Sequence, residues 1–181
     1  MYHPILRWLH SLMAGLLLVM IPLGLILPHL EEGPWAGFLY EIHKSIGILL
    51  FGLIIIRVVA RLRLSSPHNP TAISAVWYRF IKLAHFALYG LMIAIPLLGY
   101  GATSICCAPI VWMGVYEIPL TIDASEDTAK LLFSWHAGLA WALALIVVGH
   151  ILAALWHRHR QDGIFQRMWP SQGASSSGEG G

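Results

Sequence analysis

Charged side chains are scarce in this sequence. Only 11% of its 181 residues are Asp, Glu, Lys or Arg, whereas 57% are hydrophobic. Soluble domains carry about 25% charged residues. A soluble protein of this length cannot cover so much apolar surface, so the composition indicates an integral membrane protein. The net charge of +2 is small, and the basic residues form no run suited to binding nucleic acid.

Cysteine is almost absent as well, and the two that occur, Cys106 and Cys107, are neighbours. The sequence has no C-x-x-C motif of the kind used for zinc or dithiol chemistry, and it lacks the C-x-x-C-H signature of covalent haem attachment. Adjacent cysteines rarely form a disulfide, so we interpret the pair as structural.

The sequence does not predict a cleavable signal peptide either. The first apolar run ends in "LPHLEEG", which is not a small-residue cleavage site. We therefore expect the first helix to be retained.

Four apolar segments are present, at about residues 4–28, 42–61, 80–104 and 131–156. Each is near the roughly 20 residues that a helix needs to cross about 30 Å of hydrocarbon. Helices satisfy their backbone groups internally, as lipid requires. The sequence therefore predicts an all-α membrane protein with one four-transmembrane-helix domain over residues 1–170. The Gly/Ser-rich segment 171–181 is predicted to be a disordered tail.

The distribution of lysine and arginine predicts the orientation of these helices. One side of the membrane receives Arg7, Arg57, Arg61, Arg63, Arg79, Lys82, Arg158, Arg160 and Arg167. The other receives only Lys44 and Lys130, together with seven acidic residues. The positive-inside rule then places both termini in the cytoplasm.

Five of the ten histidines fall within the predicted helices, namely His10, His43, His85, His136 and His150. His136 and His150 lie on one helix, about 21 Å apart along its axis and only about 40° apart around it. The rise per residue in the other helices places His43 at the outer level with His136. It places His10 and His85 at the inner level with His150. The sequence therefore predicts two layers of imidazoles across the bundle.

Two facing imidazoles at each level are a suitable donor set for two haems, because a porphyrin fills four positions of its iron and two histidines fill the axial pair. Gly47, Ala140 and Gly149 lie near these histidines and leave room for a flat macrocycle, although small residues also serve plain helix packing. Two alternatives remain. Histidines in membrane helices can serve packing or hydrogen bonding, or they can line a proton or metal transporter, although zinc takes three or four ligands at one point.

Four stretches carry a resemblance to a known family: "LRWLHSLMA", "EIHKSIGILLFGLIIIRVVARLR", "LAHFALYGLMIAIPLLGY" and "SWHAGLAWALALIVVGH". With "HRHRQDGIFQRMWP" near the C-terminal end, they resemble bacterial cytochrome b561 over nearly the whole chain up to Pro170. The same four helices are similar to the cytochrome b subunits of formate dehydrogenases and nickel–iron hydrogenases.

The resemblance implies two non-covalent haem b groups, with the last helix giving one ligand to each. The outer haem takes His43 and His136, and the inner haem takes His10 and His150. His85 is left over, and it can replace His10 as a ligand or hydrogen-bond a quinone or a propionate. The resemblance also implies an oxidoreductase of the bacterial inner membrane, one that oxidises superoxide on the periplasmic side and reduces ubiquinone or another quinone. Such outer-sphere transfer needs no catalytic acid, base or nucleophile.

A basic group near the inner layer comprises Arg57, Arg61, Arg79, Lys82 and His157. Arg57, Arg61, Arg79 and His157 are candidate contacts for haem propionates or a quinone carbonyl. The alternative is that these residues only follow the positive-inside rule. Quinone reduction takes up protons, and His85, His157 or His159 can relay them.

The acidic outer side does not favour an anionic substrate, because a negative field slows its approach. Only Lys44 and Lys130 offset that field near the outer layer. A periplasmic redox protein is therefore an alternative donor. A further alternative is a membrane-anchor subunit that carries electrons between quinone and a partner dehydrogenase or hydrogenase.

Overall fold

The computed structural model describes residues 1–64, 75–107, 110–118 and 122–169. The segment 171–181, predicted to be a disordered tail, lies outside the described residues. Parts of the second and third connections between helices also lie outside them.

Four long helices make up most of the described chain, and they are α1 (Pro4–Ile26), α2 (Pro34–Arg63), α3 (Ala75–Cys106) and α4 (Glu126–Arg160). Each is long and apolar enough to cross a membrane. The prediction of an all-α, four-transmembrane-helix protein is confirmed. Short 3₁₀ turns follow α1 at Leu27–His29 and α4 at Phe165–Arg167, and are labelled η1 and η2.

Helices α2, α3 and α4 extend beyond the predicted apolar segments, and in α4 polar residues form the first and last turns. At the start of α4, Ser125 caps the helix by accepting a hydrogen bond from the Thr128 backbone N–H. Glu126 and Asp127 then lie in its first turn, where the helix dipole favours negative charge. Its last turn is basic, which suits the opposite end of the dipole.

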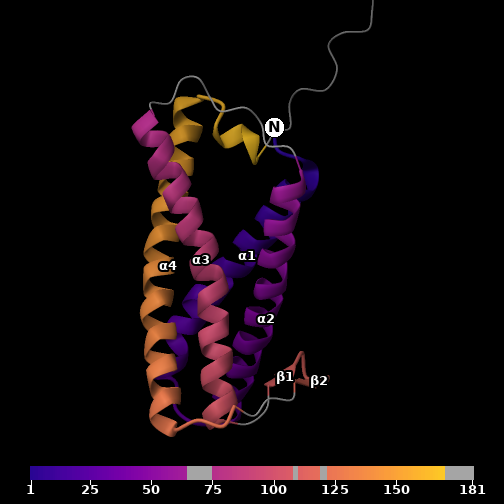
Figure 1. Cartoon of the computed structure of the whole chain (residues 1–181), viewed down its shortest axis with the longest axis vertical. Coiled ribbons are helices and arrows are strands. Elements are labelled where there is room, and N and C mark those ends of the chain that lie inside the picture. Colours follow the sequence, from indigo (N-terminus) through magenta and orange to yellow (C-terminus); the bar gives the residue numbers. More distant parts are fainter. Residues whose placement is uncertain (65–74, 108–109, 119–121, 170–181) are drawn as a thin grey trace, which may run out of the picture.

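The helices pack as an elongated bundle in which α3 runs along α4, α1 runs along α2, and α2 also contacts α3 (Figure 1). The start of α1 and the end of α4 lie at the same end of the bundle. We call this the inner end, and we call the opposite end, where α4 begins, the outer end. The arginine-rich inner end is the one that the positive-inside rule assigns to the cytoplasm.

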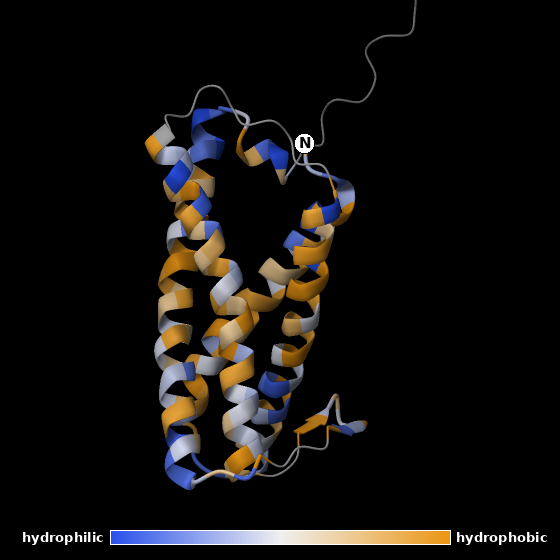
Figure 2. Ribbon diagram, viewed as in Figure 1, coloured by the Kyte–Doolittle hydropathy of each residue, from blue (hydrophilic) through white to orange (hydrophobic). Residues whose placement is uncertain are grey.

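The helix surfaces are apolar where they face outward. Trp8, Leu18 and Leu145 are more than half exposed. Figure 2 shows hydrophobic residues along the length of the helices and hydrophilic residues towards the two ends. An apolar surface of this extent is expected to contact the lipid of a membrane and not water. Inside, α1 and α2 share a small buried core made of Leu9, Met13, Leu50, Leu53 and Ile54.

A two-stranded antiparallel hairpin at the outer end was not predicted from the sequence. Strand β1 (Ile110–Trp112) pairs with β2 (Tyr116–Ile118). The turn between them needs left-handed backbone at Met113 and Gly114. The hairpin is fastened to α2 by Ser45: the Met113 backbone N–H donates to Ser45 Oγ (3.0 Å), and Trp112 Nε1–H donates to the Ser45 carbonyl (3.3 Å).

The expectation that Cys106 and Cys107 do not pair is wrong, because the structure joins them in a disulfide. α3 ends at Cys106, so Cys107 already lies outside the helix. Release from helical backbone at this point lets the two adjacent side chains meet. Both residues are exposed at the outer end.

Candidate functional site

The five predicted histidines gather in two groups at different depths in the bundle. At the outer level, His43 on α2 faces His136 on α4, with ring centroids 6.2 Å apart and planes 66° apart. At the inner level, the ring of His150 on α4 lies 6.1 Å from that of His10 on α1 and 5.5 Å from that of His85 on α3. α4 therefore gives one imidazole to each level, as the fourteen-residue spacing predicted.

The distances within these pairs fit a metal held between two imidazoles. With metal–nitrogen bonds of about 2 Å and each nitrogen about 1 Å from its ring centroid, the centroids lie about 6 Å apart. The pairs His43–His136 and His10–His150 both match that separation. By contrast, the described residues bring no group of three or more His, Cys, Asp or Glu side chains to a single metal-binding point. Paired donors suit an iron porphyrin, whereas a protein zinc site requires more ligands.

Hydrogen bonds to ring nitrogens differ among these histidines. His136 Nδ1–H donates to the Ile95 carbonyl on α3 (2.8 Å). That bond leaves Nε2 as the nitrogen with a free lone pair, which is the usual arrangement of a metal-binding histidine. His85 Nδ1 instead contacts the Ile81 carbonyl of its own helix (2.7 Å), and His85 is exposed. His43 Nδ1 is buried and has no hydrogen-bond partner among the described residues.

Two glycines that sequence reasoning missed lie directly against the outer pair. A Cβ on Gly24 of α1 would lie 3.0 Å from His43 Cε1, and one on Gly99 of α3 would lie 2.8 Å from His136 Nδ1. Counting helical rise along α1 and α3, as was done for the histidines, places both glycines at the outer level and could have found them. Of the small residues that were singled out, Gly47 lies near Met20, whereas Gly149 has open space beside its Cα.

The basic group of the inner end divides into separate contacts. Arg57 is buried, its Nη1–H donates to the Leu6 carbonyl on α1, and its charge interacts with His10 and His150. It therefore belongs to the inner level. Arg79 and Lys82 are exposed, and Lys82 lies over the Tyr78 ring.

Arg61, four residues after Arg57, holds the N-terminal segment. Its Nη2–H donates to the Tyr2 hydroxyl (3.1 Å), and its guanidinium lies 4.5 Å from the Tyr2 ring centroid. Its Nη1 is buried and lacks a partner among the described residues, as does Nε of Arg7. These are donor groups available to an acceptor at the inner end.

His157 holds the segment after α4 in place. Its Nδ1 lies 2.7 Å from Asp162 Oδ2, and the Ile164 backbone N–H donates to Asp162 Oδ1 (3.2 Å). Partial burial raises the pKa of Asp162, but the hydrogen bonds from His157 and Ile164 outweigh that effect, and the net pKa lies below its usual range. The Tyr2 backbone N–H donates to the Arg167 carbonyl (3.2 Å), so the N-terminal segment and the segment after α4 are joined at the inner end. His159 is exposed.

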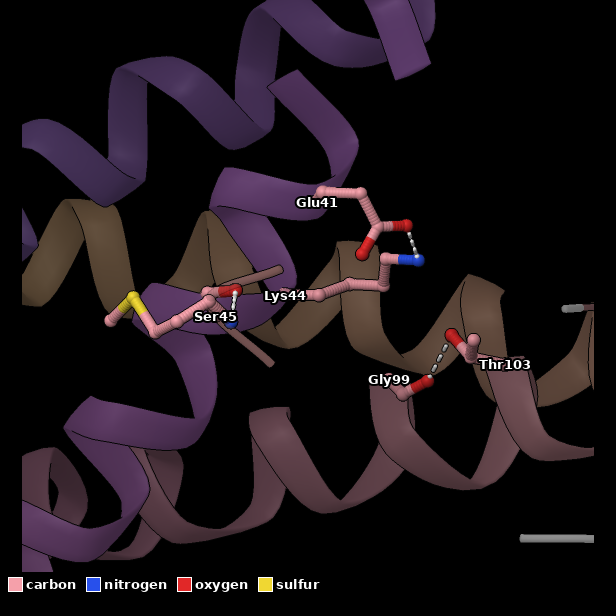
Figure 3. Close-up of polar contacts among 6 residues, drawn as sticks. Glu41, Lys44, Ser45, Gly99 and Thr103 are labelled. Carbon is pink, nitrogen blue, oxygen red and sulfur yellow. Dashed lines mark hydrogen bonds and ion pairs between the residues drawn. The ribbon is translucent and has the colours of Figure 1, made fainter. Parts of the chain in front are cut away.

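Both outer lysines have acidic partners. Lys44 pairs with Glu41 one turn earlier in α2 (Figure 3). Lys130 Nζ lies 4.0 Å from Glu126 Oε2 and 3.8 Å from Asp127 Oδ1. Neither lysine is therefore an isolated positive charge at the outer end.

Comparison with known proteins agrees with the histidine arrangement. The sequence profile of the family described as prokaryotic cytochrome b561 matches residues 1–171. The chain belongs to this family. It is a cytochrome b561 family membrane electron-transfer protein, and this membership implies oxidoreductase activity and bound haem b.

Two curated relatives cover most of the chain. Cytochrome b561 homolog 2 of Escherichia coli (strain K12) is 34% identical over 175 residues, which span 94% of this chain and 90% of the relative. The probable superoxide oxidase CybB of Yersinia pestis is 29% identical over 141 residues, 77% of each protein. The cytochrome b561 of this chain is thus a multi-pass bacterial membrane protein.

Proposed function

We propose that this cytochrome b561 binds two haem b groups and carries electrons across the bacterial inner membrane, from superoxide on the periplasmic side to a membrane quinone such as ubiquinone. The observation that carries the proposal is the presence of two histidine pairs with ring centroids 6.2 and 6.1 Å apart, both completed by α4. About 21 Å of α4 separates the two levels. Each bound haem supplies one-electron redox chemistry.

At the outer level, His43 and His136 are the proposed axial ligands. They come from helices α2 and α4, and the hydrogen bond from His136 to the Ile95 carbonyl orients its ring. At the inner level we propose His10 and His150. The His10–His150 centroid separation of 6.1 Å matches the metal-bridged value of about 6 Å more closely than the His85–His150 separation of 5.5 Å does.

His85 is proposed as a contact or proton donor for quinone rather than as a ligand. Its exposed ring lies beside His150 at the inner level. Its Nδ1 is occupied by the Ile81 carbonyl, which leaves Nε2 for a ligand or a proton. Quinone reduction consumes protons, and the exposed His159 at the inner end, together with His157, can pass them on from the cytoplasm.

Arg57 and Arg61 are proposed contacts of haem propionates or of a quinone carbonyl. Arg57 is buried at the inner level, and Arg61 Nη1 is a buried donor that lacks a partner among the described residues. Guanidinium groups bind carboxylates strongly because both members of the hydrogen bond are charged. Arg79 is exposed on α3, which favours a contact nearer the membrane surface.

A periplasmic redox protein is the second candidate donor, because Lys44 and Lys130 are both paired with carboxylates. The name of the Yersinia pestis relative supports superoxide. The acidic outer end supports a positively charged protein partner instead. In either case the outer histidine pair is the proposed entry point for electrons.

Haem quantification in the purified protein and in five His→Ala variants tests the proposal. We expect two haems in the wild type, one in His10→Ala, His43→Ala, His136→Ala or His150→Ala, and two in His85→Ala. Stopped-flow mixing with superoxide should then reduce the wild-type haems, and added quinone should reoxidise them. A correctly folded preparation that is colourless after growth with ample haem would contradict the proposal, and haems that superoxide does not reduce would contradict the superoxide step alone.

A further inference from the structure

The approach of His136 to α3 is possible only because residue 99 has no side chain. A Cβ at Gly99 would lie 2.8 Å from His136 Nδ1 and 2.9 Å from its Cε1. At separations below about 3 Å, repulsion between two carbon or nitrogen atoms outweighs their dispersion attraction, whose optimum is near 3.5–4.0 Å. The methyl group of an alanine at position 99 would be fixed to the α3 backbone, and the His136 imidazole that it meets is a rigid ring. Gly99→Ala must therefore displace the imidazole.

The close contact between His136 and α3 also allows His136 to form its hydrogen bond. Its acceptor, the Ile95 carbonyl, lies one helical turn before Gly99 on the same face of α3. One turn after Gly99, Thr103 Oγ1–H donates to the Gly99 carbonyl (2.8 Å, Figure 3). The α3 backbone from Ile95 to Thr103 is therefore fixed by side-chain donors on both sides of the glycine.

We propose that Gly99 is a positioning residue for the outer haem ligand. By leaving the α3 backbone bare, it lets His136 Nδ1–H reach the Ile95 carbonyl, which fixes the tautomer that presents Nε2 to iron and raises the basicity of that nitrogen. This inference rests on the proposed function in naming iron as the partner of Nε2. The new element is that Gly99 lies on α3, which supplies neither of the outer ligands, and still controls the orientation of His136.

The outer pair is asymmetric in this respect. Gly24 on α1 makes room for His43 in the same way, with a Cβ position 3.0 Å from His43 Cε1, but His43 Nδ1 has no hydrogen-bond partner among the described residues. The Gly99 contact therefore combines space with a hydrogen bond, whereas the Gly24 contact provides space alone. The midpoint potential of the outer haem should therefore depend on the hydrogen bond that Gly99 permits, which the Gly24 contact lacks.

The test is a redox titration of the holoprotein carrying Gly99→Ala, with Gly90→Ala as the matched control. Gly90 lies on the same helix and has nothing within 4 Å of its Cβ position. Losing the hydrogen bond makes His136 a weaker donor to ferric iron. At a fixed ambient potential we expect the ratio of reduced to oxidised outer haem to rise about tenfold in Gly99→Ala, which corresponds to about 59 mV for one electron. The inner haem and the Gly90→Ala protein should titrate as the wild type does.

A second measurement decides the matter if Gly99→Ala loses its outer haem. His136→Gly protein is supplied with imidazole or with 1-methylimidazole, which has no N–H to donate. With Gly99 present, imidazole should give the lower outer potential, and with Gly99→Ala that difference should vanish. Equal potentials for the two ligands, or an unchanged outer haem in Gly99→Ala, would overturn the inference. Wild-type protein with two haems in the same series would show that the haem-binding part of the proposed function stands even if the role of Gly99 does not.

Discussion

Arg57 of α2 donates a hydrogen bond from Nη1 to the backbone carbonyl of Leu6 in α1, across 51 residues of sequence. Both residues are buried. The bond ties the start of α1 to the inner half of α2, and the guanidinium charge acts on His10 and His150. One arginine thus connects the packing of the inner end with the electrostatics of the inner histidine level.

Replacing this arginine should affect both properties. Arg57→Met removes the hydrogen bond from a charged donor to the Leu6 carbonyl inside the bundle, which costs about 1–3 kcal/mol. It also removes a positive charge that favours the reduced inner haem, so the inner midpoint potential should fall. Thermal unfolding in detergent and redox titration measure the two effects. Arg63→Met, at the exposed end of the same helix, is the control and should change neither. An unchanged inner potential in Arg57→Met would show that Arg57 has only a packing role.

Ser45 should be the residue that holds the outer hairpin on the bundle. Ser45→Ala removes the oxygen that accepts from the Met113 backbone N–H, at an expected cost of about 1 kcal/mol. Hydrogen exchange of residues 110–118 should then speed up by about fivefold or more. Ser104→Ala is the matched control, because the Ser104 hydroxyl donates to the Tyr100 carbonyl within α3 and not to the hairpin as far as the structure describes it. Equal exchange in the two variants would mean that the Trp112 contact suffices to hold the hairpin.

The Asp162 carboxylate should make the segment after α4 sensitive to acid. Because its pKa is lowered on folding, its stabilising contribution is complete above the unfolded value of 3.8 and is lost as the pH falls through the lower folded value. Protection of the Ile164 backbone N–H, which donates to Asp162, should therefore decrease as the pH falls below 3.8 and be absent at all pH values in Asp162→Ala, which has no side-chain acceptor. The effect is local and small because water screens the pair. Asp123→Asn, at the opposite end of the bundle, is the control and should leave Ile164 protected at neutral pH.

The sequence was sufficient to predict the four helices and the two levels of histidine. Hydrophobic length determines the helices. The fixed rise and turn of one helix determine that His136 and His150 share a face. These are properties of single helices, so they do not depend on how the helices pack.

The remaining features depend on packing between helices, which no single helix reveals. Spacing could not choose between His10 and His85, because each helix can rotate about its own axis, and the structure brings both rings near His150. Gly99 carries no signal of its own until α4 is placed beside it. The hairpin was missed for a similar reason, since its short strands are stabilised by contacts with Ser45.

The charge of the outer end gives a test that separates the two candidate donors. Lys44 and Lys130 are paired with Glu41, Glu126 and Asp127, so the field at this end should repel an anion. Salt screens that field, with a Debye length of about 10 Å at 0.1 M and about 3 Å at 1 M. For superoxide, the bimolecular rate of haem reduction should therefore rise with ionic strength, by up to about tenfold.

For a basic protein donor the dependence should have the opposite sign, because the same field then attracts the partner. At low salt, the double variant Glu126→Gln/Asp127→Asn should raise the rate of haem reduction by superoxide and lower the rate of haem reduction by the protein donor. Both differences from the wild type should disappear at 1 M salt. Stopped-flow measurements over this range give the rates, with the uncharged reductant duroquinol as a salt-insensitive control. A superoxide rate that falls as salt is added would show that the anion enters by a positively charged route, in conflict with the ion pairs of Lys44 and Lys130.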